Sequence, residues 1–414
     1  MVTTVYDPFD PDVLDEPYPA YRQLRDHDPV HHQPGTGGDG FWALSRFADI
    51  WDAVRDAETF SSAQGITFEN EVERLGLAPT IVMLDPPRHT KLRSLVGRAF
   101  NPRRVQQLED RVRQFARRRV VDMEAKAADG APVDLHREFS SPLPTYVLGS
   151  LLGVPDEDRH LFDPWVRALT RLQDAGFAAE ELRGAGPAVA EMYEYFSSLI
   201  AQRRCEPTDD LLGALVAAEV DGERLSDWDI LGFCFVMVAG GNDTTGNLIS
   251  HGAMLLDRDH AQRERIVADP SLIPNALLEF LRLESSVQGL ARTTTRAVTI
   301  RDTEIPEGSK VMMLYGSGNR DEREFGPDSE QLDITRSIPH HLGFSTGAHF
   351  CVGSHLARLQ AKVAFEELFA RQPEIGVDVE AGRRLHSSFT RGWISLPATG
   401  IRTSAAAMRS SSPQ

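Results

Sequence analysis

The chain has 414 residues, of which 41% are hydrophobic and 25% charged, an ordinary composition for a globular protein with a sizeable core. Its net charge of −17 at pH 7 argues against a general nucleic-acid binder, which would present a basic surface. The three cysteines lack disulfide or Cys-x-x-Cys spacing, and no secretory signal is visible. The longest near-apolar run, residues 230–241, is too short to span a bilayer. We therefore expect a cytoplasmic protein without a membrane anchor.

The N-terminal part of the chain predicts short elements followed by a long irregular stretch. Helical spacing favours a helix over residues 18–27, residues 41–44 form a strand-like run, and residues 46–55 return to a helical pattern. Residues 61–80 show little periodicity and mix glycine and proline with apolar side chains. A loop of this length is uncommon unless it has a function.

A basic segment follows, in which His89 and Arg93 stand four residues apart after Pro86 and Pro87. Prolines suit the first turn of a helix, and this spacing puts the two side chains on one helical face. From the spacing alone, a solvated basic face explains these residues at least as well as a binding site does.

Helical patterns dominate the middle of the chain. They predict one helix over residues 103–123, helical structure over residues 156–204 with a break at residues 184–187, and a short helix that opens at Asp209. The break is placed where two glycines and a proline come together. The aromatic stripe that follows it is best explained as core.

A long helix is predicted from about Trp228 to about Leu256, with Ser226 and Asp229 as a capping-box-like start. Inside it lie two glycines, at positions 240 and 241, followed by Asp243 and Thr244. Each mid-helix glycine costs about 1 kcal/mol relative to alanine, and a carboxylate on an apolar helix adds to the cost. The pattern indicates a helix crossing or a ligand pressed against the backbone. No strand precedes the glycines, which argues against a dinucleotide-binding loop.

The C-terminal half adds a helix, several strands and a polar tail. Glu279 and Arg282 share a helical face, for which a surface ion pair is the common explanation. Residues 293–313 alternate in strand fashion with a turn at residues 305–308, and short strands are expected around Phe389. We expect the tail, residues 403–414, to be disordered.

The most informative segment runs from Phe344 to Gly353, directly before a helical pattern. Cys351 lies there at the end of a glycine-punctuated loop, where free N–H groups and the helix dipole favour a thiolate. A thiolate in such a place can be a nucleophile, a metal ligand or a haem ligand, and a structural cysteine is the plain alternative. A zinc site that combines Cys351 with His341 and His349 is another alternative.

The whole segment, Phe-x-x-Gly-x-His-x-Cys-x-Gly followed by Leu-Ala-Arg, resembles the haem-ligand loop of the cytochrome P450 family. Ser345 departs from the glycine that the family often has there. Similar motifs occur in the family's order from residue 7 to about residue 400. The resemblance implies one P450 domain over residues 1–402, mainly α-helical with a smaller β-rich region, and haem b between the long central helix and the cysteine loop.

The resemblance also assigns residues to the haem. Cys351 is expected to be the axial ligand of the haem iron. Asp-Pro-Pro-x-His-Thr-x-x-Arg, with His89 and Arg93, resembles the family's propionate-binding helix, and Arg292 and His349 take positions that face the propionates in the family. Arginine suits such a carboxylate through paired hydrogen bonds. Residues 61–80 would lie over the haem.

In the same way, Asp243 and Thr244 match the acid and the alcohol that deliver protons from the family's central helix, where the glycines make room for dioxygen. Glu279 and Arg282 match its Glu-x-x-Arg pair, and Arg336 matches the arginine that closes a buried network with that pair. We assign these last three residues a structural role.

The reaction that the resemblance implies is oxygen insertion into an apolar small molecule. The two electrons would come from a ferredoxin or flavodoxin-type partner with its NAD(P)H reductase, since no such domain is attached. The candidate pocket residues are Val238, Ala239, Val287, Leu290 and Phe389. The candidate basic face for the redox partner consists of Arg103, Arg104, Arg358 and Lys362. Two alternatives stay open: a P450-type enzyme for nitrogen oxidation, coupling or rearrangement, and a non-catalytic haem sensor or carrier.

Overall fold

Helices form most of the chain in the computed structural model, which describes residues 6–35, 40–68, 80–100, 102–174, 179–220 and 222–403. The helices are α1 (Pro11–Asp15), α2 (Tyr18–His27), α3 (Phe47–Arg55), α5 (Arg88–Ala99), α6 (Pro102–Gln106), α7 (Glu109–Ala128), α8 (Pro142–Leu152), α9 (Phe162–Asp174), α10 (Ala179–Cys205), α11 (Leu211–Ala217), α12 (Asp227–Gly241), α13 (Asp243–Arg258), α14 (His260–Ala268), α15 (Ile273–Leu283), α16 (Tyr315–Gly318), α17 (Glu322–Phe325) and α18 (Ser354–Arg371). Shorter helical turns are η1 (Ile81–Met83), η2 (His136–Ser140), η3 (Asp156–Leu161), η4 (Pro270–Leu272) and η5 (Gly347–His349).

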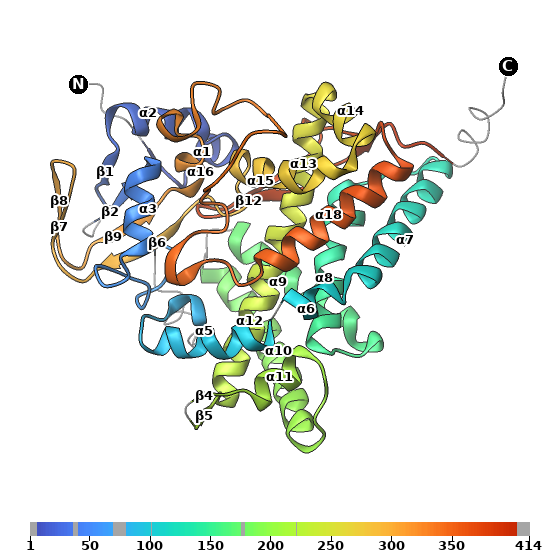
Figure 1. Ribbon diagram of the computed structural model, residues 1–414, viewed down its shortest axis with the longest axis horizontal. Coiled ribbons are helices and arrows are strands. Elements are labelled where there is room, and N and C mark those ends of the chain that lie inside the picture. The colour runs from blue at the N-terminus through green and yellow to red at the C-terminus, as the bar shows by residue number, and fades with distance from the viewer. Residues whose placement is uncertain are drawn as a thin grey trace.

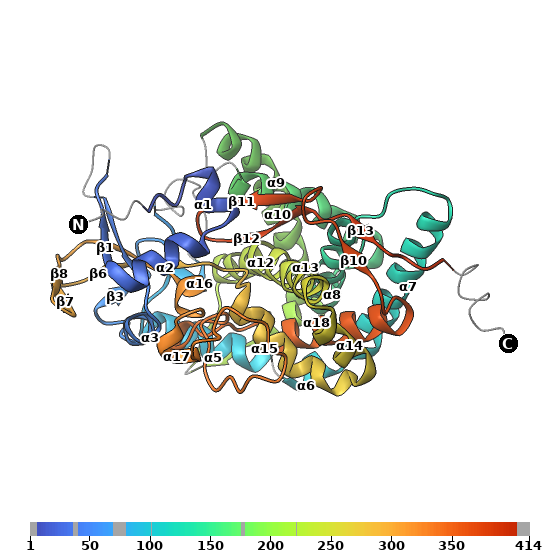
Figure 2. The same cartoon turned by 90° about the horizontal axis from the view of Figure 1, so that it is seen from above.

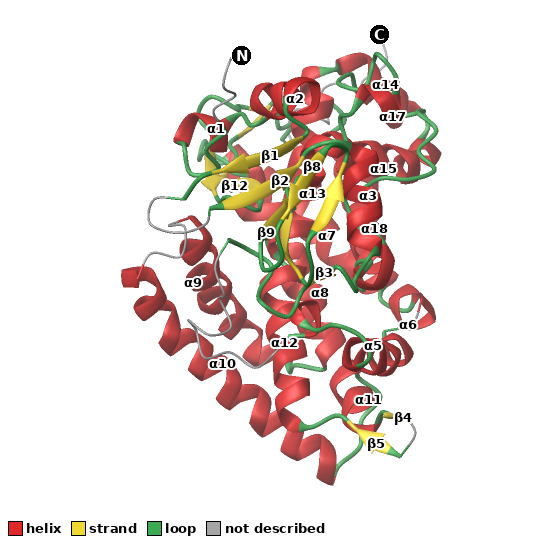
Figure 3. Ribbon diagram, turned by 90° about the vertical axis from the view of Figure 1, so that its left-hand side faces the viewer, coloured by secondary structure: helices red, strands yellow, loops and turns green. Residues whose placement is uncertain are grey.

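The strands are short, and β1, β2, β6, β7, β8 and β9 gather on one side of the molecule, away from α7 and α10, whereas β4 and β5 lie beside α11 (Figure 1). They are β1 (Val30–Gln33), β2 (Phe41–Leu44), β3 (Phe60–Ser61), β4 (Glu219–Val220), β5 (Glu223–Arg224), β6 (Leu290–Thr294), β7 (Val298–Ile300), β8 (Thr303–Ile305), β9 (Lys310–Met313), β10 (Gly376–Val377), β11 (Arg383–His386), β12 (Arg391–Ser395) and β13 (Ala398–Thr399). Figure 3 shows most of them at one end and α9, α10 and α12 toward the other.

The largest sheet has the order β1-β2-β9-β6-β3. Strand β2 pairs with β1 in antiparallel and with β9 in parallel fashion, and β6 is antiparallel to both β9 and β3. Helix α3 packs on it through Phe47, Ile50 and Val54, which share a hydrophobic cluster with Val311 and Met313. The pairing joins residues 30–61 to residues 290–313, so Arg292 on β6 is held near the N-terminal part of the chain.

Helix α13 lies in the middle of the helical side, with α8 and α18 close to it (Figure 2). Its close packing depends on Gly252, where an added Cβ would lie 2.6 Å from Phe280 and 2.7 Å from Phe365. Only a glycine lets α15 and α18 approach the same point of α13. The largest hydrophobic cluster of the molecule surrounds this crossing.

Several predicted elements are confirmed. Helix α2 and strand β2 have the predicted bounds, α3 begins one residue later than predicted, and Asp210 caps α11 through its side chain. The strands around Phe389 and the turn with Gly308 at a φ of 78° are present. Most of the predicted loop 61–80 and all but residue 403 of the predicted tail lie outside the described residues.

Two predictions place the interruptions of helices wrongly: one predicted break is absent, and one helix predicted to be continuous is divided. Helix α10 runs through the predicted break and contains Pro187, because the loss of one backbone hydrogen bond does not end a long helix that packs on α9 and α12. The predicted helix over residues 103–123 is instead divided into α6 and α7. The N–H of Leu108 bonds to the carbonyl of Val105, three residues back, and this tighter turn ends α6.

The predicted long helix also consists of two helices, α12 and α13, which meet at Asn242. The predicted capping box of Ser226 and Asp229 is present at its start. Within the described ranges, no helix has both the length and the apolar composition that crossing a membrane requires.

Candidate functional site

A cavity with a volume of about 370 Å³ lies between the α12–α13 junction and the cysteine loop. Its wall includes Phe235 and Leu169 from the helical side, Leu290 from the sheet and Cys351 from the loop. Segments far apart in the sequence therefore enclose one mostly apolar space. Ligand sites in proteins commonly have this character.

The two glycines of the central helix serve different purposes at this cavity. An added Cβ on Gly241 would lie 3.3 Å from Leu148 of α8, so this glycine permits a helix crossing. Gly240 lines the cavity, and no atom lies within 4 Å of its added Cβ. Gly241 therefore allows the helices to pack closely, and Gly240 leaves open space beside the backbone.

The cysteine loop is built by two left-handed residues. Gly347 has a φ of 67° and approaches α3 so closely that an added Cβ would lie 3.2 Å from Arg55. Ser345 has a φ of 58°, which is unusual for a residue other than glycine, and its hydroxyl lies 3.3 Å from the phenol oxygen of Tyr315. The N–H of Cys351 donates to the carbonyl of Phe344 at 2.9 Å and closes the loop.

The environment of Cys351 differs from the sequence expectation in one respect. Burial raises the pKa of its thiol, while the N–H groups of Gly353 and Ser354 and the charge of Arg93 act in the opposite direction. Burial outweighs the loop and the helix dipole, so a free thiol there stays protonated at neutral pH. A bound metal cation deprotonates such a ligand, and this suits a metal-ligating role better than that of a free nucleophile.

Four basic side chains, His89, Arg93, Arg292 and His349, gather beside the cysteine loop and are called the basic cluster here. The rings of His89 and His349 lie 4.2 Å apart between centroids, and Arg93 donates to the carbonyl of Phe350 at 2.6 Å. Burial and the neighbouring arginines lower the pKa of His89, and they lower the pKa of His349 to about 3. Both histidines are therefore neutral at pH 7.

The basic cluster fits the acidic edge of a haem. Within the described ranges, neither Arg93 nor Arg292 has a carboxylate within ion-pair distance, although Arg292 is only 2% exposed. The Nδ1 atom of His89 is buried without a hydrogen-bond partner. Buried positive charge is costly unless it is paired, so this cluster suits an anion supplied from outside the chain. Two propionates of a haem bound through Cys351 would meet that requirement.

Asp243 and Thr244 lie at the start of α13 and line the cavity. Burial raises the pKa of Asp243 to about 6, while hydrogen bonds from Thr170 and Asn242 act in the opposite direction. The hydroxyl of Thr244 donates to the carbonyl of Gly240 at 2.7 Å, one turn back. Because its proton is used there, the Thr244 oxygen is left to accept a hydrogen bond from a group in the cavity.

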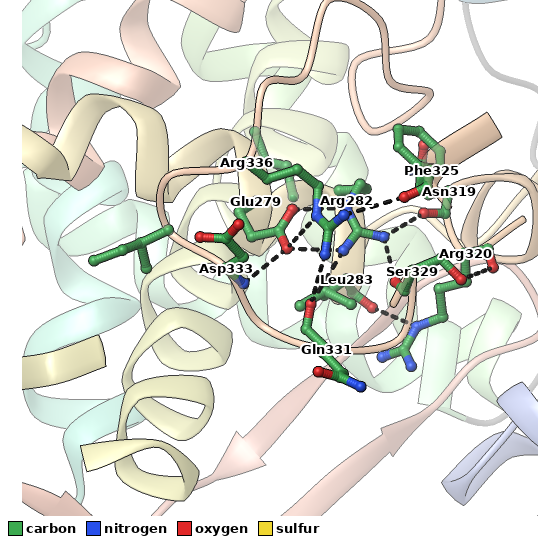
Figure 4. A network of polar contacts seen from close by, with 12 residues as sticks. Glu279, Arg282, Leu283, Asn319, Arg320, Phe325, Ser329, Gln331, Asp333 and Arg336 are labelled. Atoms are coloured by element: carbon green, nitrogen blue, oxygen red, sulfur yellow. Dashed lines mark hydrogen bonds and ion pairs between the residues drawn. The ribbon is translucent and has the colours of Figure 1, made fainter. Parts of the chain in front are cut away.

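Glu279 and Arg282 of α15 form a closed polar network with Arg336 (Figure 4). The side chains of Glu279 and Arg282 are 0% exposed and their closest charged atoms are 2.7 Å apart, so the common surface-pair explanation is wrong here. Arg336 reaches Glu279 at 3.2 Å and also bonds to Asp328. We name these three residues the Glu279 network.

Four of the five candidate pocket residues line the cavity, namely Ala239, Val287, Leu290 and Phe389. Val238 is the exception, because its side chain is 1% exposed and packs in the hydrophobic core. The rotation of α12 turns Val238 toward the core, whereas its neighbours Met237 and Ala239 line the cavity. The sequence reasoning missed Phe235, one turn before Ala239, and Leu169 on α9, whose position follows from tertiary packing alone.

The candidate basic face is partly neutralised by acidic residues of the same chain. Arg104 pairs with Asp209 at 2.8 Å, and Lys362 pairs with Glu366 at 2.8 Å. Arg103 is exposed on α6, which packs beside α18. The described residues bring no three His, Cys, Asp or Glu side chains into a metal-binding group, which leaves the alternative zinc site without support.

The chain was compared with known proteins. The family model of cytochrome P450 matches residues 52–371. Cytochrome P450 130 of Mycobacterium tuberculosis is 47% identical over 390 residues, covering 92% of this chain and 94% of that protein. A methyl-branched lipid omega-hydroxylase of the same organism is 37% identical over 391 residues, covering 92% of this chain and 90% of that protein.

Among solved structures, a cytochrome P450 from Chondromyces apiculatus superposes with a TM-score of 0.85 at 36% identity, covering 96% of this chain and 99% of that chain. The similarity thus extends over nearly the whole chain in both sequence and fold. It includes the helices and the loop that enclose the cavity. The chain therefore belongs to the cytochrome P450 family, whose members are haem b monooxygenases.

Proposed function

We propose that this monooxygenase hydroxylates an apolar small molecule, with dioxygen and with two electrons from a separate redox partner. The observation that supports this most is the cavity itself. Its apolar wall is interrupted at the start of α13 by a buried acid and an alcohol that line the same space. A sensor or carrier needs no such proton-carrying pair.

Haem held by Cys351 and the basic cluster would supply the activation of dioxygen. The chain's own residues would supply position and protons. Asp243, with a pKa near 6, can take up a proton from water and release it at neutral pH. Thr244, fixed by its bond to Gly240, would accept a hydrogen bond from the protonated group and keep the proton at that point of the cavity.

The substrate class follows from the lining. Leu169, Phe235, Leu290 and Phe389 offer apolar contact, and among the described lining residues on the α12–α13 side Asp243 is the one charged group. A neutral, apolar molecule is favoured because most of this lining offers an ionic group no partner to replace its hydration. The relative named as a methyl-branched lipid omega-hydroxylase acts, by its name, on a substrate of this kind.

A ferredoxin or flavodoxin-type protein with its NAD(P)H reductase is the proposed electron donor, and the cytoplasm is the proposed compartment. Support for the donor comes from exposed Arg103 on α6, which packs beside α18, the helix that follows the cysteine loop. Support for a reducing compartment comes from Cys205, Cys234 and Cys351, which are all free thiols.

Two measurements test the proposal. A spectral-shift screen of the purified holoenzyme against lipids, sterols and terpenoids should identify an apolar ligand, which is then turned over with a surrogate ferredoxin and reductase. A hydroxylated product is expected, whereas an N-oxide, a coupled dimer or the absence of turnover would contradict it. Thr244→Ala should still bind the ligand but divert most of the NADH consumed to hydrogen peroxide. An unchanged ratio of product to NADH would show that Thr244 has only a structural role.

A further inference from the structure

The junction between α12 and α13 is held by two neighbouring helices, and this suggests how the acid of the cavity is positioned. Thr145 on α8 donates its hydroxyl to the side-chain oxygen of Asn242, the residue between the two helices. The Asn242 amide in turn donates to Oδ1 of Asp243 at 3.3 Å. One oxygen of the carboxylate is therefore bonded through its neighbour in the chain.

The second oxygen is bonded by α9. The hydroxyl of Thr170 donates to Oδ2 of Asp243 at 2.9 Å. Among the side chains that the structure describes, no cation lies within ion-pair distance of Asp243, and the neutral hydroxyl of Thr170 takes the place of the ion pair that usually holds such a carboxylate. Thr170 belongs to no motif, and its position follows only from the packing of α9 against α12.

The charged side chains that the structure describes on the neighbouring helices do not compete for this role. Helix α8 carries none. Asp163, Arg167 and Arg171 of α9 are exposed. On α10, the groups with described partners bond elsewhere: Glu191 to Trp165, Tyr195 to Asp158, Arg203 to Asp210 and Arg204 to Asp227. Thr170 and Asn242 are thus the two described groups that bond to the carboxylate.

We propose that Thr170 is a positioning residue, which holds the Asp243 carboxylate for proton delivery and makes that delivery sensitive to the position of α9. The inference rests on the proposed role of Asp243. Leu169, the preceding residue, lines the cavity, so one turn of α9 contacts both the substrate space and the acid. A ligand that displaces Leu169 would also displace the hydroxyl of Thr170. A single neutral hydrogen bond is weaker than an ion pair, and the carboxylate can therefore turn away from it readily.

The test compares Thr170→Val, which keeps the shape of the side chain but lacks the hydroxyl, with Thr170→Ser, which keeps the hydroxyl. Loss of a hydrogen bond to the charged form should raise the pKa of Asp243 by about one unit in Thr170→Val and leave it unchanged in Thr170→Ser. Infrared difference titration of the carboxyl stretch measures this pKa directly, with Asp243→Asn to assign the band. The stretch should also move to higher frequency in Thr170→Val.

Turnover with surrogate partners gives the second readout. Proton-limited turnover should fall as pH rises through the pKa of Asp243, since fewer molecules carry the proton, and this fall should occur at a higher pH in Thr170→Val. If Thr170→Val does not retain haem, Thr170→Ala takes its place. A wild-type band and pH profile in the hydroxyl-free variant would overturn the role of Thr170. A pH profile that Asp243→Asn leaves unchanged would instead refute the proposed function of Asp243.

Discussion

The Glu279 network and the basic cluster both hold buried or partly buried arginines, but among the described residues only the first contains a carboxylate that pairs them. Arg282 and Arg336 share Glu279, and the backbone carbonyls of Asn319 and Ser329 accept further bonds from Arg282. Arg93 has no such acid within the described ranges, and its guanidinium bonds to a backbone carbonyl instead.

The difference separates structure from function. A buried arginine that is fully paired within the chain needs nothing from outside and stabilises the fold around it. Buried arginines without a carboxylate leave the chain incomplete until an anion arrives. Asp243 is the converse case, a partly buried acid that has no cation beside it among the described side chains, and it too lines the cavity. Unpaired buried charges, more than buried charges in general, therefore mark the site.

Breaking the Glu279 network should have the largest effect on stability. Glu279→Gln leaves Arg282 buried without its negative partner, which typically costs about 3–5 kcal/mol. We expect the free energy of unfolding of the purified protein, measured in urea, to fall by that amount, or the variant to accumulate in insoluble form. Glu366→Gln, at a partly exposed ion pair, is the control. Equal stability of both variants would contradict the distinction between the two kinds of site.

Removing the basic cluster should weaken haem binding without weakening the protein itself. Two lost charge-assisted bonds of about 1.5 kcal/mol each correspond to an affinity for haem about 100-fold lower in the Arg93→Ala, Arg292→Ala variant. The haem-free form should be at least as stable as wild type, because repulsion between the cations is removed. Haem transfer kinetics and urea unfolding of both forms measure this. Unchanged haem content and melting temperature would refute the assignment.

Asp243 gives a pH-dependent test of the idea that unpaired charges mark the site. Its pKa is raised by burial from an unfolded value near 3.8 to about 6, so the wild-type protein loses stability as pH rises through this window. Asp243→Asn removes the buried charge and should be more stable than wild type by about 2 kcal/mol at pH 7.5, with little difference at pH 4. Urea unfolding at both pH values measures this difference in stability. An Asp243→Asn variant that is less stable than wild type at pH 7.5 would contradict the prediction.

The exposed arm of the Glu279 network should give the smallest effect. Asp328 is bonded by Arg336 from an exposed position, which lowers the pKa of its carboxyl. The stability that this ion pair contributes is present above the unfolded pKa of Asp328 and is lost as pH falls through the lower pKa of the folded state. Asp328→Asn should therefore lower the urea midpoint at pH 7 much less than Glu279→Gln does, and high salt should abolish the remaining difference from wild type.

The sequence predicted local elements and residues that belong to motifs. Helix α2, strand β2, the capping box of Ser226 and the turn at Gly308 depend on neighbouring residues, and all are present. It did not predict the interruption at Asn242, because the bond from Thr145 that holds it comes from another helix. Thr170 and Leu169 were missed for the same reason. Val238 was assigned to the pocket although only the rotation of α12 decides which of its residues face the cavity.

The left-handed conformation of Ser345 has a consequence for how the cysteine loop tolerates sequence change. A residue other than glycine costs about 1–2 kcal/mol at such a φ, and the contact of the Ser345 hydroxyl with Tyr315 offsets part of that cost. Serine and glycine can therefore both occupy this position without moving Cys351, whose own N–H bonds to Phe344 instead. Larger side chains would add crowding to the same conformational cost. The conformation of the backbone therefore restricts the residue type at this position more than any chemical requirement on the side chain does.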